Sequence, residues 1–175
     1  MPATSRPSPG PDAVVHIART GDALAICEFG ATHVRRHYAP LIGEQAADAQ
    51  VARWWNEDQV RAAVSAGLVV VAEAGGRVVG VTQRGRAGVD HVIYKLYLDP
   101  RYRGRGLGPR LVAALVDQLP PDATRLCVEH FAGNERAGAF YEREGFTVER
   151  VDPSATGDPA LDVVWRARTL RDAGG

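Results

Sequence analysis

A β-branched and aromatic run, followed by a glycine-rich turn and an amphipathic helix, is the feature that most constrains the fold. The run from His91 to Leu98 is typical of a strand, and an Asp-Pro pair follows it. Pro109 suits the first turn of a helix with apolar residues on one side that ends before Pro120. Residues 126–131 are the next expected strand. This order predicts a right-handed parallel crossover, and hence an α/β fold.

The remaining chain predicts two helical stretches before this unit. One runs from about Asp22 to Tyr38 and is stopped by Pro40, and the other runs from near Ala47 to Gly67. A last helix is expected over residues 134–144, with Gly145 after its C-terminus. Alternation and β-branched residues predict further strands at residues 14–18, 68–73, 78–83, 146–151 and 161–167.

Length and charge limit the class of protein. The 175 residues suit one domain, which we place at residues 13–170 between tails at 1–12 and 171–175. The first tail contains four prolines and no apolar run, so we expect a flexible segment rather than a signal peptide. Lys plus Arg equals Asp plus Glu at 21 each, which argues against nucleic acid or an anionic membrane as a partner. We expect a soluble, cytoplasmic protein.

The two cysteines, Cys27 and Cys127, follow no metal-ligand spacing and lie in apolar surroundings. We therefore expect reduced thiols that fill core space, no disulfide framework and no metal site.

A glycine-rich turn between the predicted strand and helix is a candidate anion site. It reads Arg103-Gly104-Arg105-Gly106-Leu107-Gly108. Its backbone N–H groups and the helix dipole favour an anion, and Arg101, Arg103 and Arg105 add positive charge. The glycine spacing does not fit a dinucleotide fingerprint, and the Gly-Lys-Ser/Thr of a nucleoside-triphosphate loop is absent from the sequence. The alternative is a tight turn with solvated charges.

A second segment makes the ligand more specific. Residues 134–146 have an Asn, then a Tyr seven residues later, in a predicted helix that ends at Gly-Phe. Together the two segments resemble the GCN5-related N-acetyltransferase (GNAT) superfamily over roughly residues 14–167. The resemblance implies a single-domain α/β (α+β) fold with about four helices. Its sheet is expected to be mixed and mostly antiparallel, with a splayed central pair of parallel strands.

The resemblance also implies roles for individual residues. The loop at 103–108 is expected to hold the pyrophosphate of coenzyme A, and the backbone of residues 96–98 its pantetheine arm and the thioester carbonyl. The N–H of Leu96 is the expected polarising donor. Asn134 is expected to bind the pantetheine or pyrophosphate region, or simply to cap the helix. Tyr141 is expected to be the general acid, with a core tyrosine as the alternative. The cofactor-binding residues expected on this basis are Leu96, Tyr97, Leu98, Arg103, Gly104, Arg105, Gly106, Leu107, Gly108 and Asn134.

The sequence identifies the general base less clearly than the other site residues. Some family members carry a glutamate on the long strand, but Val92 aligns with it here. Glu129 and His130 are the nearest replacements, and alternation along the strand lets only one of them face the cleft. We favour Glu129 as the catalytic base. His91 is expected to be solvated, and an acceptor that arrives neutral, or loses its proton through water, stays open.

The expected activity is transfer of an acetyl group from acetyl-CoA to a primary amine of a small molecule or peptide (EC 2.3.1.-). The acceptor should lie between the early helices and the closing strands. Tyr38, Trp54, Trp55 and Trp165 either line that pocket or belong to the core. A non-catalytic acyl-CoA-binding sensor module is the alternative function. A homodimer is common in the family.

Overall fold

The computed structural model describes residues 12–170 and forms one mixed sheet. The tails expected at 1–12 and 171–175 lie outside the described residues, apart from Asp12. The strand order is β1-β2-β3-β4-β5-β7-β6, and only the β4–β5 pair is parallel. The strands are β1 (Val14–Ile17), β2 (Val69–Ala74), β3 (Arg77–Ala87), β4 (Asp90–Leu98), β5 (Arg125–Phe131), β6 (Thr147–Asp152) and β7 (Val163–Thr169).

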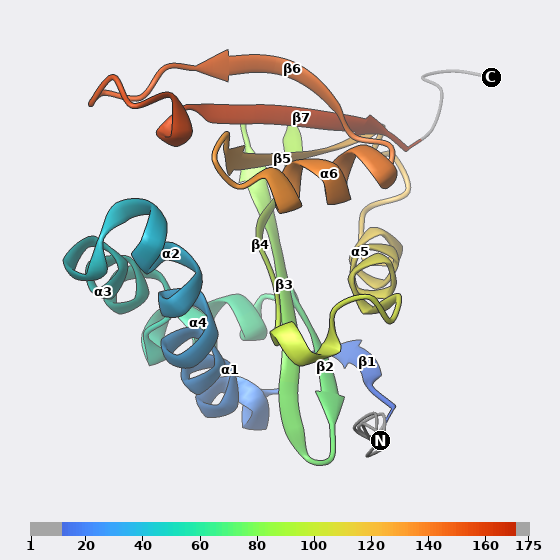
Figure 1. Cartoon of the computed structure of the whole chain (residues 1–175). Coiled ribbons are helices and arrows are strands. Elements are labelled where there is room, and N and C mark those ends of the chain that lie inside the picture. The colour runs from blue at the N-terminus through green and yellow to red at the C-terminus, as the bar shows by residue number, and fades with distance from the viewer. Residues whose placement is uncertain (1–11, 171–175) are drawn as a thin grey trace, which may run out of the picture.

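Helices cover both faces of this sheet. Figure 1 shows α1 to α4 grouped on one side of the long strands, with α5 on the other side and α6 beneath β5 and β7. The α5 helix joins β4 to β5, so the predicted crossover is confirmed. The helices are α1 (Ala23–Phe29), α2 (Arg35–Ile42), α3 (Glu44–Trp54), α4 (Glu57–Ser65), α5 (Leu107–Asp117) and α6 (Glu135–Arg143). Within residues 12–170, every helix is too short or too polar to cross a membrane.

The two early helical stretches are each divided, which the sequence did not predict. A π-helical turn at Gly30–Val34 separates α1 from α2. Pro40 does not stop α2, which ends instead before Gly43, where φ is 88°. A proline inside a helix removes the one hydrogen bond that its own N–H would donate. The second stretch breaks at Trp55, and α4 restarts at Asn56, whose side chain accepts from the Gln59 N–H at 3.0 Å.

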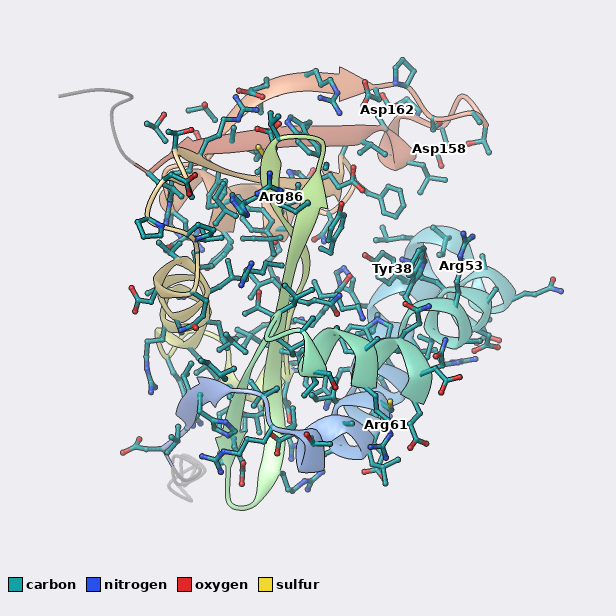
Figure 2. All side chains as sticks on the ribbon, turned by 180° about the vertical axis from the view of Figure 1, so that it is seen from behind. Tyr38, Arg53, Arg61, Arg86, Asp158 and Asp162 are labelled. Carbon is teal, nitrogen blue, oxygen red and sulfur yellow. The ribbon has the colours of Figure 1, made fainter. Side chains whose placement is uncertain are left out.

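The core lies in two layers on either side of the sheet. In β2, Val69 and Val71 pack with residues of α1 and α4, whereas Val70 and Ala72 pack with residues of α5. This burial on both faces explains why the first four residues of β2 are all apolar. Figure 2 shows side chains filling the space between the long strands and the helices on both sides. Phe146, which is fully buried, belongs to a cluster that joins α5 and α6 to β4 and β5.

A β-bulge in β4 marks the point where the sheet opens. Gln83 of β3 faces Lys95, but its neighbour Arg84 faces Ile93, so Tyr94 is an extra residue. The parallel pairing of β4 with β5 covers only three residue pairs and ends at Ile93↔Val128. The two strands diverge beyond the bulge, which confirms the expected splayed pair.

Candidate active site

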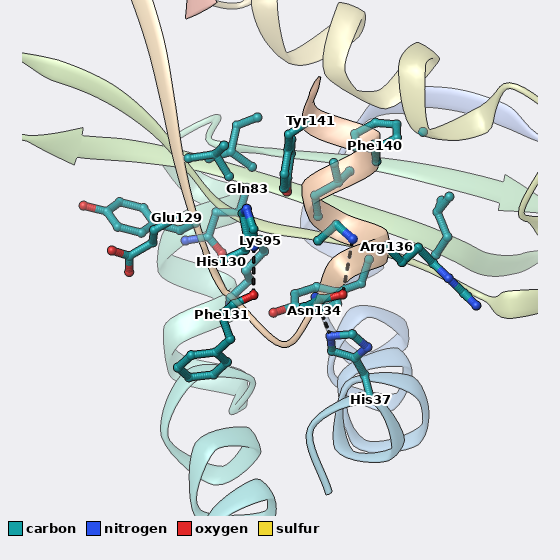
Figure 3. Close-up of a pocket in the computed structure, with 18 of the residues that line it drawn as sticks. His37, Gln83, Lys95, Glu129, His130, Phe131, Asn134, Arg136, Phe140 and Tyr141 are labelled. Atoms are coloured by element: carbon teal, nitrogen blue, oxygen red, sulfur yellow. Dashed lines mark hydrogen bonds between the residues drawn. The ribbon is translucent and has the colours of Figure 1, made fainter. Parts of the chain in front are cut away.

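A cleft of about 1540 Å³ runs through the opening between β4 and β5. Its walls come from both strands, from the start of α5, from α6, and from α2 and α3. Figure 3 shows the labelled side chains of Lys95, Glu129 and Tyr141 in this cleft, with His37 and Asn134 nearby. The gap in the sheet therefore brings together residues that are far apart in the sequence.

The glycines of the loop at 103–108 serve two different purposes. Gly104 and Gly106 have φ of 73° and 74°, a left-handed conformation that favours glycine, and Gly106 lies at the N-cap of α5. Gly108 is needed for packing, because a Cβ there would lie 2.9 Å from the Phe140 ring. Pro109, at the third helical position, has no N–H to donate. The Leu107 and Gly108 N–H groups remain without an intrahelical acceptor and can bind an anion.

Two arginines, from different elements, line this end of the cleft. Arg103 comes from the loop and Arg136 from the first turn of α6. Burial first, and then the charge of Arg136, lowers the pKa of Arg103. Two like charges held at one site favour a multiply charged anion.

Two neighbouring arginines have partners within the chain, and a role of Arg105 in cofactor binding stays a prediction. Arg101 is paired with Asp99 at 2.6 Å, so its charge is already balanced. The guanidinium of Arg105 lies over the ring of Tyr102, 5.0 Å from the centroid. Sequence reasoning missed Arg136, although its place two residues after Asn134, at the start of a helix, was a usable signal.

Asn134 caps α6 and contacts a second element. Its Oδ1 accepts from the Ala137 N–H at 3.2 Å, and its Nδ2 donates to Nε2 of His37 at 3.0 Å. Burial lowers the pKa of His37, and Arg103 and Arg136 lower it further, so the ring accepts as a neutral imidazole. The capping alternative is therefore confirmed, while a role in cofactor binding stays a prediction.

Tyr141 lies in the cleft on α6 and is only 6 % exposed. Its ring is stacked on that of His130, with centroids 6.0 Å apart, and contacts the rings of Phe140 and Phe146 edge-on. Burial raises the pKa of Tyr141 well above its usual range, so the phenol keeps its proton at neutral pH. Such a group can donate a hydrogen bond or a proton, but cannot act as a base.

Glu129 and His130 both line the cleft. The expectation that only one of them faces it is wrong, because the cleft lies where β4 and β5 no longer pair, and both residues line it. Nδ1 of His130 lies 2.9 Å from the Phe131 carbonyl, and its Nε2 accepts from Nε of Arg166 at 3.0 Å. Burial lowers its pKa, and both ring nitrogens are engaged. Glu129, which is exposed to the cleft, is the better placed of the two to accept a proton.

Val92, which aligns with the glutamate of some family members, does not line the cleft. It is fully buried in a cluster with Cys127, Trp165 and Ala167. His91 is also buried, 6 % exposed, and its Nε2 lies 3.1 Å from Nη1 of Arg86. The expectation that His91 is solvated is therefore wrong.

Both cysteines fit the sequence prediction in their redox state. Cys27 and Cys127 are free thiols, partly buried and buried respectively. Burial raises the pKa of both thiols, which keeps them protonated.

The backbone of β4 beyond the bulge is open on one side. The Asp99 N–H donates to the Val79 carbonyl at 2.8 Å, and Tyr97 faces Val81 in the register with β3. Because successive backbone groups point to opposite sides of a strand, the Leu96 and Leu98 N–H groups point toward β5. The backbone N–H of Tyr97 points toward β3 and is therefore turned away from the gap. It is the side chain of Tyr97 that lines the cleft.

Aromatic rings form the wall of the cleft on the side of α2 and α3. The hydroxyls of Tyr38 and Tyr97 are 2.6 Å apart, and burial raises the pKa of both phenols. Of the two alternatives that the sequence left open, Trp54 and Trp55 both line the cleft, and Trp55 belongs to the core as well. Trp165, the fourth expected aromatic residue, is outside the lining and belongs to the core.

Comparison with known proteins agrees with this geometry. Residues 65–148 match the acetyltransferase (GNAT) domain family. No curated protein matches this chain. Among solved structures, the PaiA N-acetyltransferase from Thermoplasma acidophilum, in complex with coenzyme A, has a TM-score of 0.76 at 15% identity. The alignment covers 91% of this chain and 99% of that one.

Two further solved structures share the fold. YncA from Salmonella typhimurium, with its cofactor acetyl-CoA, has a TM-score of 0.68 at 22% identity over 93% of this chain and 96% of that one. The ribosomal-protein-S18-alanine N-acetyltransferase from Escherichia coli has a TM-score of 0.64 at 21% identity over 93% and 97%. At these identities the likeness is one of fold. Residues 65–148 thus match the GNAT acetyltransferase domain family, and the chain has the fold of the solved acetyltransferases.

Proposed function

We propose that the protein is an acetyltransferase that moves the acetyl group of acetyl-CoA to a primary amine. One observation carries the proposal: a single cleft joins a cationic loop at a helix N-terminus to a protonated, buried tyrosine, through an opening in the sheet. Two similar structures, with coenzyme A and with acetyl-CoA bound, support the choice of ligand.

The residues present fit coenzyme A. The pyrophosphate would be held by the Leu107 and Gly108 N–H groups and by Arg103 and Arg136. The open edge of β4 offers backbone N–H and C=O groups, which suit the amides of the pantetheine arm. Under this proposal Leu96 N–H binds the thioester carbonyl oxygen and stabilises the negative charge that develops on it.

The chain supplies two proton-transfer groups for the reaction. Glu129 takes a proton from the acceptor ammonium, directly or through water, so that the amine lone pair can attack the thioester carbon. The attacking nitrogen, which is positively charged once it has bonded to carbon, releases a proton to water. The C–S bond then breaks, and Tyr141 protonates the departing sulfur and regains its proton from water. The products are the N-acetylated acceptor and free coenzyme A.

Replacing Tyr141 with phenylalanine separates catalysis from binding. We expect an unchanged affinity for coenzyme A, measured by calorimetry, and a fall in thiol release of about 100-fold or more. Tyr102→Phe is the matched control, because Tyr102 lies outside the cleft lining and keeps its ring under Arg105. Full activity of the Tyr141 variant would exclude Tyr141 as the acid. Binding of acetyl-CoA without transfer to any amine would favour a sensor module instead.

A further inference from the structure

Lys95 is the one lysine in the chain. The other twenty basic residues are arginines, so this protein uses a guanidinium nearly wherever it uses a cation. The ammonium group of lysine is compact, and its pKa responds to burial, whereas arginine stays charged and planar. The single lysine also lies inside the cleft. The residue type and the place are therefore both informative.

The bulge at Tyr94 determines which face of the sheet Lys95 occupies. Ile93, before the bulge, packs with residues of α5 and α6. In a strand without a bulge, Lys95 would share the face of Ile93, because side chains two residues apart point the same way. The bulge reverses the alternation, so Lys95 and Tyr97 face the helices α1 to α4. Lys95 thus enters the cleft on the side expected to hold the acceptor.

The contacts of Lys95 suit a positive charge but do not neutralise it. Its Nζ donates to the Trp54 carbonyl at 2.6 Å and lies 4.4 Å from the centroid of the Trp55 ring. Trp54 ends α3, and the carbonyl end of a helix carries partial negative charge. Throughout residues 12–170, no carboxylate forms an ion pair with Lys95. Since an ammonium has three donors, two remain for a ligand.

Burial makes this uncompensated charge sensitive to a ligand. Desolvation lowers the pKa of Lys95 to about 8, and Cys27 is the ionisable neighbour that acts on it. At neutral pH the group is still mostly charged. A bound anion would stabilise the charge, whereas a second cation would be repelled. The site therefore favours an anionic group and disfavours a polyamine.

We propose that Lys95 binds a carboxylate of the acceptor, and that the acceptor is an amino acid with an apolar or aromatic side chain. The inference rests on the proposed acetyltransferase function. Glu129 faces the same cleft and would take the ammonium, so that the two ends of a zwitterion meet opposite charges. Tyr38, Trp54 and Tyr97 provide an aromatic wall for its side chain.

Acceptor pairs that differ only in the carboxylate test this proposal. Phenylalanine is compared with phenethylamine, and leucine with isoamylamine, by release of coenzyme A from acetyl-CoA. We expect kcat/KM to be at least about 10-fold higher for each amino acid than for its amine. Lys95→Gln should remove that preference, losing about 30-fold with the amino acids and less than about 3-fold with the amines. Lys95→Arg, which keeps the charge, should retain part of the preference.

The outcomes distinguish this inference from the proposed function. Coenzyme A affinity, measured in parallel, should be the same in the wild type and the Lys95 variants. Equal use of amines and amino acids by the wild type would keep the acetyltransferase and overturn the carboxylate site. An equal loss with both substrate types in Lys95→Gln would also overturn it, because it indicates a purely structural role. No thiol release with any acceptor would overturn both proposals.

Discussion

Replacing Lys95 with methionine is expected to stabilise the fold, although it removes a hydrogen bond. Methionine has a similar length, carries no charge and makes favourable contacts with aromatic rings such as Trp55. The variant removes the buried ammonium from the cleft without changing the backbone. Residues that a protein needs for function often lower the stability of its fold, and we expect Lys95 to be one of them.

The magnitude follows from the pKa of Lys95. Burial lowers it from its ordinary 10.5 to about 8, and each pKa unit corresponds to about 1.4 kcal/mol. The charged lysine therefore destabilises the native state by about 3 kcal/mol at pH 7. Loss of the hydrogen bond to Trp54 offsets about 1 kcal/mol of this. Loss of the contact with the Trp55 ring offsets about 0.5–1 kcal/mol. We expect a net gain of about 1–2 kcal/mol in the free energy of unfolding.

The direction in which the stability difference changes with pH distinguishes removal of the buried charge from a mere change in side-chain packing. Below pH 8, Lys95 is protonated in both the folded and the unfolded chain, so its full penalty is present. Between pH 8 and 10.5 the folded chain loses the proton first, and the unfolded chain binds more protons. Wild-type stability therefore rises with pH over this window, relative to the variant. The advantage of Lys95→Met should vanish by about pH 10.

Urea unfolding of both proteins from pH 7 to pH 10 measures this difference. Arg53→Met is the matched control, because it removes the same net charge from the end of α3, where the guanidinium lies over the Trp54 ring. Its effect should not change with pH over this range. Since the chain has one lysine, selective ¹³C labelling of lysine gives a single signal whose titration reports the pKa directly. A Lys95→Met variant less stable than the wild type at pH 7, or a pH-independent difference, would refute the reasoning.

Three further substitutions test the local structure around the cleft. Gly106→Ala should lower stability by about 1–2 kcal/mol and weaken coenzyme A binding, because φ is 74° there; Gly21→Ala, in open space, is its control. Asn134→Ala should lose about 1 kcal/mol with the cap of α6, as urea unfolding will show, and an unchanged midpoint would contradict the cap. Phe146→Ala should lower the free energy of unfolding by about 3–5 kcal/mol in the same assay. A loss below about 1 kcal/mol would mean that the core repacks to fill the cavity.

The strands and the two segments that line the cleft at helix starts were predictable from local sequence. β-Branched runs identified β2 and β4, and the residue types at 103–108 and 134–146 indicated the two helix starts that line the cleft. These signals are local, because a strand propensity or a capping residue acts within a few positions. The signal at Gly104 and Gly106 is local too, because each residue has a positive φ, which glycine adopts more readily than other residues.

The missed features depend on contacts between distant parts of the chain. The order of residues in β4 does not reveal its bulge, which exists only relative to the register of β3. For the same reason, alternation along β5 suggested a choice between Glu129 and His130 that the open sheet removes. Arg136 and Lys95 become cleft residues only once α6 and α3 are in place.

The extra residue at Tyr94 links the opening of the sheet to the selectivity proposed for it. The pairing of β4 with β5 ends at Ile93, directly before the bulge, and the Leu96 and Leu98 N–H groups are thereby left facing the gap. The same bulge places Lys95 on the face of Trp54, opposite to the face on which Ile93 packs. The proposed cofactor site, built from backbone groups, and the proposed acceptor site, built from a side chain, thus depend on one irregularity. Under the proposed function, a shift of this bulge would disturb both sites together, whereas Lys95→Gln would alter acceptor choice alone.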